Sequence, residues 1–492
     1  MSIIARQGFK YSLISYFGFL IGTFASIFLF PRDMNFYGKL RFILPTAEML
    51  LPIVVFGLSF SNVKFFAIAQ KNGKHQNLLT LSLVGIGINF TLFCAGFWGF
   101  FHLFPDFQKL EMWKMKNLIL PLILLLALSA VLNKYISNYK RIAIPNIFEN
   151  LFPKLANIGA FCLFFFAGLS ETGAMAFFFG MFILSLTGYF TYANRLEKIT
   201  PDFGTGFIRN NRLWVSILSY SFFGFLGNIG NYIAFRVDNY MIGEFLTFED
   251  NGIYSIMLSV ISFVTIPQMG LFNISAPLIN KAIEENNFEE LNRFHKKTSL
   301  ALFFLGAVVF SCILVGFPYL TFYMKNGEQL RLAQPVIWIL GFTMLFDLAT
   351  GFNGHIISLS RYYRFTIPIM LFLAITTILL NHLFITQTHW GIVGIALATA
   401  ISLTLFNLIK IGFNYLKFKV YPLSIEMVYI TILCTLGITL AILLPSFETP
   451  FLNMIYKPLV VLGILLIGNH FMKIYPLGHF LNKDFMKGLL KK

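Results

Sequence analysis

The stretch that decides the fold runs from Leu213 to Ser275. It reads LWVSILSYSFFGFLGNIGNYIAFRVDNYMIG (213–243), then EFLTFEDNG (244–252), then IYSIMLSVISFVTIPQMGLFNIS (253–275). Two apolar segments, each long enough to cross a bilayer, flank a short acidic turn. The first segment keeps Arg236 and Asp238 well inside its length. A charge at bilayer depth costs about 2.5–3.5 kcal/mol on insertion scales, so we expect these two residues to face a cavity or a partner.

The rest of the chain has the same apolar character. Of its 492 residues, 57% are hydrophobic and only 12% are charged, with 61 Phe and a mean hydropathy of +0.75. Apolar runs of about twenty residues recur from end to end, which predicts an all-α integral membrane protein with about 14 transmembrane helices. The expected spans are 9–30, 41–63, 78–103, 117–136, 143–168, 173–193, 213–243, 251–276, 298–323, 332–357, 365–385, 390–415, 424–445 and 455–475.

The formal net charge is +16, which raises the question of a nucleic-acid partner. Membrane proteins keep Lys and Arg in their cytoplasmic loops, and this bias explains the excess without nucleic acid. With the N-terminus inside, basic residues favour the cytoplasmic side by roughly three to one. We therefore expect a multi-pass protein with both termini in the cytoplasm and no nucleic-acid partner.

Two inter-helix turns resemble each other and suggest a duplication. FPRDMNFYGKLRF (30–42) and FLTFEDNGIYSIM (245–257) each place a Gly within two residues of an aromatic residue, before a helix that contains a Pro. Chance likeness between two short turns is the alternative. The simplest organisation has two pseudo-symmetric six-helix lobes, 1–193 and 213–415, joined by a cytoplasmic linker at 194–212. A terminal helix pair and a basic cytoplasmic tail occupy 416–492.

The best candidates for a binding site lie on the seventh expected helix. Asn228, Tyr232, Arg236 and Asn239 are spaced by four, four and three residues, which puts them on one helical face. Asp238 belongs to a second polar line. A guanidinium at this depth suits an anionic group, most naturally a phosphate, which it can bind in bidentate fashion. The alternatives for Arg236 are a structural ion pair with a neighbouring helix and snorkelling to the interface.

Further polar candidates lie elsewhere in the chain. Asp347 and Glu48 stand inside apolar spans, where we expect a coupling or structural role. Lys64, Arg361 and Arg364 fall near the expected cytoplasmic mouth, where they would attract an anionic head group; the general basic bias of that side is the alternative.

Signatures of catalysis are missing from the sequence. It contains no P-loop, GxSxG, HExxH, paired CxxC or glycine-rich nucleotide loop. We therefore expect a protein that is not an enzyme, with no catalytic residue, no cofactor and no metal site.

Three motifs carry a resemblance to a known family. They are FPRDMNFYG after the first helix, VDNYMIG–x–F at the end of the seventh, and NGIYS at the start of the eighth. With these motifs and fourteen spans, the chain resembles the Wzx-type polysaccharide and O-antigen flippases of the multidrug/oligosaccharidyl-lipid/polysaccharide (MOP) superfamily. The resemblance implies a MATE-like fold and alternating access. It also implies translocation of undecaprenyl-diphosphate-linked oligosaccharide across a bacterial inner membrane, with polysaccharide polymerase and chain-length proteins as partners.

Three other functions stay open at this point. A MATE-like drug/cation antiporter would prefer acidic residues in the cavity, and a lipid II flippase would carry more cations in its first two helices. A membrane-embedded glycosyltransferase or polymerase would need a large extracytoplasmic catalytic loop.

Overall fold

The computed structural model describes residues 3–209 and 212–475, which form helices and short connections without a β-strand in these ranges. The chain divides into two compact units. We call residues 2–255 and 370–382 the N-terminal unit, and residues 256–369 and 383–492 the C-terminal unit. The basic tail expected beyond residue 475 lies outside the described residues.

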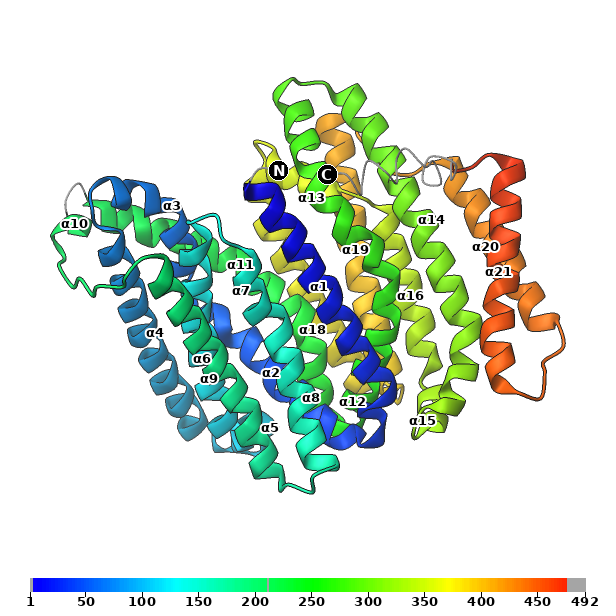
Figure 1. Ribbon diagram of the computed structural model, residues 1–492, viewed down its shortest axis with the longest axis horizontal. Coiled ribbons are helices and arrows are strands. Elements are labelled where there is room, and N and C mark those ends of the chain that lie inside the picture. Colours follow the sequence, from blue (N-terminus) through cyan, green and yellow to red (C-terminus); the bar gives the residue numbers. More distant parts are fainter. Residues whose placement is uncertain (1–2, 210–211, 476–492) are drawn as a thin grey trace. The chain divides into compact units, whose positions relative to one another are not determined.

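The N-terminal unit is built from long helices with short connections (Figure 1). It contains α1 (Ile3–Phe28), α2 (Met34–Val55), α3 (Leu58–Lys71), α4 (His75–Leu103), α5 (Glu111–Lys114), α6 (Lys116–Ser137), α7 (Ala143–Asn146), the π-helix Ile147–Leu151, α8 (Phe152–Phe165), α9 (Glu171–Leu196), α10 (Gly206–Arg209), α11 (Leu213–Phe245), the first half of α12 (Phe248–Ile261) and residues 370–382 of α18 (Thr366–Gln387).

The C-terminal unit holds the remaining helices (Figure 1). Besides the rest of α12 and α18, they are α13 (Ile266–Glu284), α14 (Phe288–Leu320), α15 (Gly327–Leu332), α16 (Gln334–Ala349), α17 (Asn353–Leu359), α19 (Gly391–Phe418), α20 (Ile425–Leu443) and α21 (Pro450–Met472).

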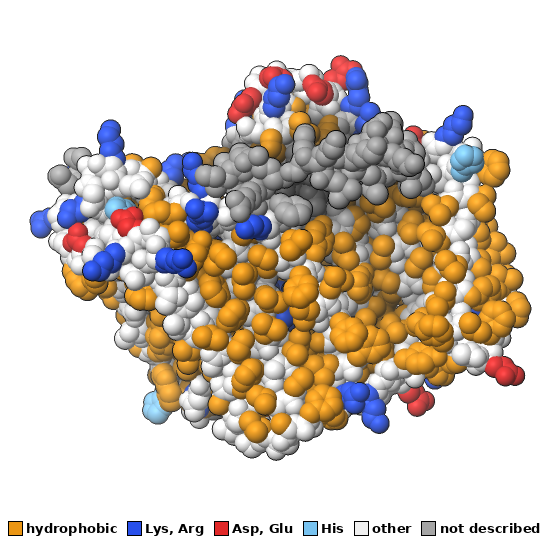
Figure 2. Space-filling model, in the orientation of Figure 1, with side chains coloured by type: hydrophobic (Ala, Val, Ile, Leu, Met, Phe, Trp, Pro, Cys, Tyr) orange, Lys and Arg blue, Asp and Glu red, His pale blue; other side chains and the backbone are white. Residues whose placement is uncertain are grey.

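The expected all-α membrane architecture is confirmed, with fewer uninterrupted spans than expected. In the described ranges, ten helices are long and apolar enough to cross a membrane, or twelve if each of two bent pairs counts as one span. The other two expected spans, 143–168 and 251–276, are helical but interrupted, by the π-helix and by a 3₁₀ turn at Ser262–Thr265. Large apolar side chains cover the lengths of the helices, whereas Lys, Arg, Asp and Glu gather at their ends (Figure 2).

The expected span 41–63 is bent because two consecutive residues adopt left-handed backbone conformations. Phe56 has φ 45° and Gly57 has φ 71°, and α2 and α3 meet there at 45°. Gly57 also lies directly against the backbone of α11, where a Cβ would overlap the carbonyl oxygen of Ser221. The break therefore needs glycine for conformation and for close approach.

The two similar turns of the sequence pack against each other inside the N-terminal unit. A Cβ on Gly38 would overlap the carbonyl oxygen of Phe248, and a Cβ on Gly252 would overlap that of Met34. Gly38 thus contacts the residue four positions before Gly252, and Gly252 contacts the residue four positions before Gly38. The Asn251 side chain adds a hydrogen bond to the carbonyl oxygen of Gly38, at 3.0 Å. This contact is reciprocal between the two turns.

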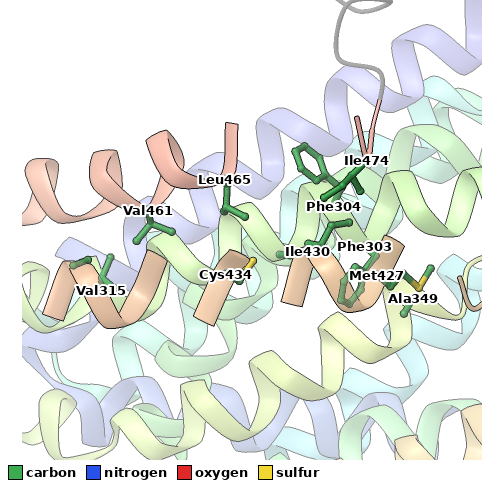
Figure 3. Close-up of a cluster of buried hydrophobic side chains, with 12 residues drawn as sticks. Phe303, Phe304, Val315, Ala349, Met427, Ile430, Cys434, Val461, Leu465 and Ile474 are labelled. Carbon is green, nitrogen blue, oxygen red and sulfur yellow. The ribbon is translucent and has the colours of Figure 1, made fainter. Parts of the chain in front are cut away.

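The expected terminal helix pair packs on α14 in the C-terminal unit. Buried side chains from α14, α20 and α21 form one cluster that includes Phe303, Ile430 and Val461 (Figure 3). In a water-soluble protein, burial of each such side chain would stabilise the fold by about 1.5–3 kcal/mol. Between membrane helices, close packing of the side chains provides most of the attraction instead.

The lobe boundaries at 193, 212 and 415 stay predictions. The compact units follow a different division, since α11 belongs to the N-terminal unit together with α1 to α9.

Candidate functional site

The N-terminal unit encloses a polar cavity of about 420 Å³. Residues of α2, α3, α6, α9 and α11 form its wall, together with the π-helix and the start of α8. Four of the charged or polar residues expected to be functional line it: Glu48 from α2, and Asn228, Tyr232 and Arg236 from α11. The structure therefore brings together, in one cavity, the polar face of α11 and the acidic residue of α2.

Arg236 and Glu48 form an ion pair across the cavity wall through the guanidinium Nε and a carboxylate oxygen. Their side chains are 39% and 23% exposed, so both still border open space. The guanidinium also donates to the carbonyl oxygen of Phe235, at 3.3 Å. A partner of opposite charge lowers the cost of holding either group at bilayer depth. The pair also leaves guanidinium N–H groups free to bind an anion.

Asn239 continues the face of α11 by spacing but does not line the cavity. One turn beyond Arg236 this face is covered by α12, and Asn239 is only 3% exposed. Its side-chain amide donates to Asn251 and to Ser255, both at 2.8 Å. The Arg41 guanidinium reaches the same place, donating to Ser255 at 3.1 Å. Asn239 thus holds α11 to α12 in this structure.

Asp238 is also outside the cavity wall. It is 9% exposed, and both carboxylate oxygens accept hydrogen bonds. Tyr254 of α12 donates at 2.7 Å and Asn381 of α18 donates at 2.9 Å. These contacts join three helices of the N-terminal unit. A substrate-binding role for Asp238, as for the other four candidates on α11, stays a prediction.

Several residues of the cavity wall were not singled out from the sequence as site residues. Asn133 of α6 donates to Glu149 of the π-helix at 2.9 Å, and Lys134 places its ammonium 5.6 Å from the ring of Phe60. The available signal was the spacing of Ser129 and Asn133, which are four residues apart in an otherwise apolar segment. The π-helix is consistent with a functional location, because such bulges are frequent at functional sites.

Lys154 of α8 lies next to this cavity but faces α1. Its side chain packs along two glycines of α1: a Cβ would come within 3.3 Å of the Lys154 Nζ at Gly18, and within 3.3 Å of its Cδ at Gly22. The residue is half-buried and makes no hydrogen bond or ion pair within residues 3–209 and 212–475. A Cβ at either position would press on the lysine stem, which would have to shift by a few tenths of an ångström.

The remaining candidates lie elsewhere. Lys64 is exposed on α3, with its ammonium 6.0 Å from the ring of Tyr220. Arg361 and Arg364 are exposed in the C-terminal unit, after α17. Asp347 is half-buried on α16, where one carboxylate oxygen accepts from the Asn407 amide of α19 at 2.9 Å. Their entrance and coupling roles stay predictions.

A metal site is not evident among the described side chains. In that part of the chain, no group of three or more His, Cys, Asp or Glu residues is arranged to hold an ion.

Comparison with known proteins places the fold. No family model matches the chain, and no curated protein matches it. Among solved structures, the lipid II flippase MurJ in an inward closed conformation is similar with a TM-score of 0.70 at 14% identity, over 96% of this chain and 99% of that one. An inward-facing multidrug resistance MATE transporter of the MOP superfamily gives 0.62 at 13% identity, over 84% and 94%. A MOP superfamily transporter from Pyrococcus furiosus, whose binding pocket is described as of reverse polarity, gives 0.53 at 12% identity, over 85% and 95%. The chain is therefore a multi-pass membrane protein with the fold of the MOP superfamily transporters.

Proposed function

We propose that this chain is a flippase of the Wzx type. It would move an undecaprenyl-diphosphate-linked oligosaccharide from the cytoplasmic to the outer leaflet of a bacterial inner membrane, for O-antigen, capsule or exopolysaccharide biosynthesis. The sugar and diphosphate would enter the polar cavity while the polyprenyl tail stays in lipid, and alternating access would change the side to which the cavity opens. The fold supports a transport function of this general kind, since its structural neighbours are a flippase and transporters.

The observation that carries the proposal is the chemistry of the cavity wall. Most of its polar side chains are uncharged amides, phenols and hydroxyls rather than acids or bases. The amides and phenols come from Asn133, Asn150, Asn228, Asn231, Tyr189 and Tyr232, and the aromatic rings beside them from Phe60, Phe148, Phe182 and Phe225. Sugar hydroxyls both donate and accept hydrogen bonds, which matches amide and phenol groups. The C–H faces of a sugar ring pack well on aromatic side chains, so this lining suits a carbohydrate.

Arg236 is the residue that we assign to the diphosphate. In this structure its charge is balanced by Glu48. A diphosphate oxygen pair would compete with the Glu48 carboxylate for the same guanidinium, because Arg binds phosphate in bidentate fashion. Exchange of one anion for another would let the substrate enter and leave without exposing an unpaired cation in the membrane.

Other parts of the proposal rest on the sequence. Lys64, Arg361 and Arg364 would attract the diphosphate on the cytoplasmic side, where both termini would also lie. Asp347 would take part in coupling to an ion gradient. Rocking of two six-helix lobes would exchange access, and polymerase and chain-length proteins would act on the exported product.

One observation favours a second candidate function. Glu48 and Glu149 both line the cavity, and acidic residues suit the organic cations that a MATE-like drug antiporter exports. Each carboxylate already has a partner, Arg236 and Asn133 respectively, which leaves little uncompensated negative charge for a cationic drug.

Complementation of a bacterial strain that lacks its own O-antigen flippase would test the proposal. Wild type, Arg236→Ala, Arg236→Lys and Glu48→Gln would be compared at equal membrane abundance. The readouts are surface polysaccharide and lipid-linked oligosaccharide trapped on the inner leaflet. We expect export with wild type, trapped substrate with Arg236→Ala, and partial function with Arg236→Lys, which keeps the charge but loses the bidentate geometry.

Parallel assays separate the alternatives. Rescue of cells depleted of their lipid II flippase, without O-antigen export, would identify lipid II as the substrate. Resistance to cationic drugs in an efflux-deficient strain would favour the antiporter. Absence of export across strains with different O-antigen units, for protein that is made and inserted, would refute the flippase proposal.

A further inference from the structure

Four fully buried polar side chains meet in the C-terminal unit, away from the polar cavity. They are His295 and Ser299 of α14, Asn353 of α17 and Asn414 of α19, and each is 0% exposed. The Asn353 side chain lies against the His295 imidazole, but no pair of their atoms meets the geometry of a hydrogen bond. His295 and Ser299 are one helical turn apart. The Asn414 amide donates to the Asn353 side-chain oxygen at 2.7 Å and to its backbone carbonyl at 3.1 Å. The four residues therefore form one cluster that joins three helices.

This cluster leaves five buried polar atoms without a hydrogen-bond partner in the described structure. They are both ring nitrogens of His295, the hydroxyl of Ser299, the side-chain nitrogen of Asn353 and the side-chain oxygen of Asn414. More than nine in ten buried polar groups are paired, and each exception needs an explanation such as a bound water or ion. Five exceptions at one place indicate a ligand of the cluster.

The hydrogen bonds within the cluster fix which groups face the ligand. Because the Asn414 nitrogen donates to both Asn353 oxygens, neither amide can be turned over without placing donor against donor or acceptor against acceptor. The Asn353 nitrogen is thus an unpaired donor and the Asn414 oxygen an unpaired acceptor. Ser299 and a neutral His295 each offer both kinds of group.

A mixed set of donors and acceptors selects the chemistry of the ligand. A cation would face the N–H groups of Asn353, and an anion would face the carbonyl oxygen of Asn414. Water donates and accepts, and buried waters typically make about three hydrogen bonds to groups that would otherwise be unpaired. We propose that His295, Ser299, Asn353 and Asn414 form a buried water-binding site that links α14, α17 and α19.

This water site lies directly beside the break between α16 and α17. Gly351 is the left-handed residue of that break, with φ 56°, and the two helices meet at 48°. A Cβ on Gly351 would overlap the Ser299 hydroxyl and come within 3.2 Å of the His295 Cε1. The proposed water would therefore sit at the point where the chain turns from α16 into α17.

The sign of a stability change tests the proposal. We would compare the melting temperature of the full-length protein in micelles for wild type, Ser299→Ala and Ser402→Ala. Ser402 is the matched control, because it is also 0% exposed and its hydroxyl also lacks a partner. It lies about 18 Å from Asn414 along α19, outside the cluster. Removing a dry, unpaired hydroxyl is neutral or stabilising, whereas removing a ligand of bound water breaks hydrogen bonds.

We expect Ser299→Ala to lower the melting temperature by about 2–4 °C more than Ser402→Ala does. A rise with Ser299→Ala, or a fall no larger than that of Ser402→Ala, would overturn the proposal. An experimental structure at about 2 Å resolution gives an independent check. It should show an ordered water within hydrogen-bond distance of the Ser299 hydroxyl and the Asn414 oxygen, and empty density there would also overturn the proposal.

Discussion

Replacing Gly38 by Ala should destabilise the N-terminal unit, although the same change stabilises most helices. Gly38 lies inside α2, where Ala would normally add about 1 kcal/mol of helix propensity. Here the new methyl group would occupy the position of the Phe248 carbonyl oxygen and approach the Gly252 nitrogen to 3.0 Å. Both neighbours are backbone atoms, so neither can rotate away.

The expected magnitude follows from these opposing effects. Overpacking that forces a backbone shift costs about 1–3 kcal/mol, and a backbone-to-backbone contact belongs at the upper end of that range. Subtracting the gain in helix propensity leaves a net loss of about 1–2 kcal/mol. Gly252→Ala should cost a similar amount, because it would overlap the Met34 carbonyl oxygen. The double variant should cost less than the sum, since the first methyl group already separates the two turns.

Thermal unfolding of purified protein in micelles would measure these changes. The matched control is Gly180→Ala in α9, where a Cβ would meet nothing within 4 Å. We expect Gly180→Ala to leave the melting temperature unchanged or to raise it, and Gly38→Ala to lower it. A Gly38→Ala protein that is as stable as Gly180→Ala would refute the inference that the two turns touch through their backbones.

Three further predictions concern charged residues. Glu48→Gln should strengthen binding of an inorganic diphosphate probe severalfold, measured by titration calorimetry, because Arg236 then lacks its competing carboxylate; equal affinity would contradict the exchange model. Glu197 directly follows α9. Burial raises its pKa, but the hydrogen bonds from Tyr139 and His75 lower the pKa by more, so the net pKa lies below the usual value. The ionised Glu197 should therefore stabilise the fold above about pH 4.5 and lose this effect as the pH falls below that value. The difference in melting temperature between wild type and Glu197→Gln should then shrink in acid. A difference that stays constant with pH would contradict this role of Glu197. Lys154→Met should raise the melting temperature by about 2 °C or more because it removes an unpaired cation from between α1 and α8, whereas a drop would indicate a bound anion as its partner.

Local sequence features predicted the membrane class and the polar face of α11. Hydropathy over twenty residues identifies a spanning helix whatever its neighbours are, and α11 forms as one continuous helix over Leu213–Phe245. The helical period then places Asn228, Tyr232 and Arg236 on one side, and all three line the cavity. The likeness of the turns around Gly38 and Gly252 suggested a duplication, whereas the packing of the two glycines against each other is seen only in the folded structure.

Tertiary structure decided which neighbouring helix covers each face of a helix, because the spacing of residues within one segment does not identify its neighbours. Asn239 shares the face of Arg236 by spacing, yet α12 covers it, and Asp238 is held by side chains from α12 and α18. The partner of Arg236 is Glu48, 188 positions away along the chain. The break after α2 lies where Gly57 meets the backbone of α11. Hydropathy and period are properties of one segment, whereas a partner, a covered face and a close backbone contact depend on which segments meet, and only the folded chain determines that.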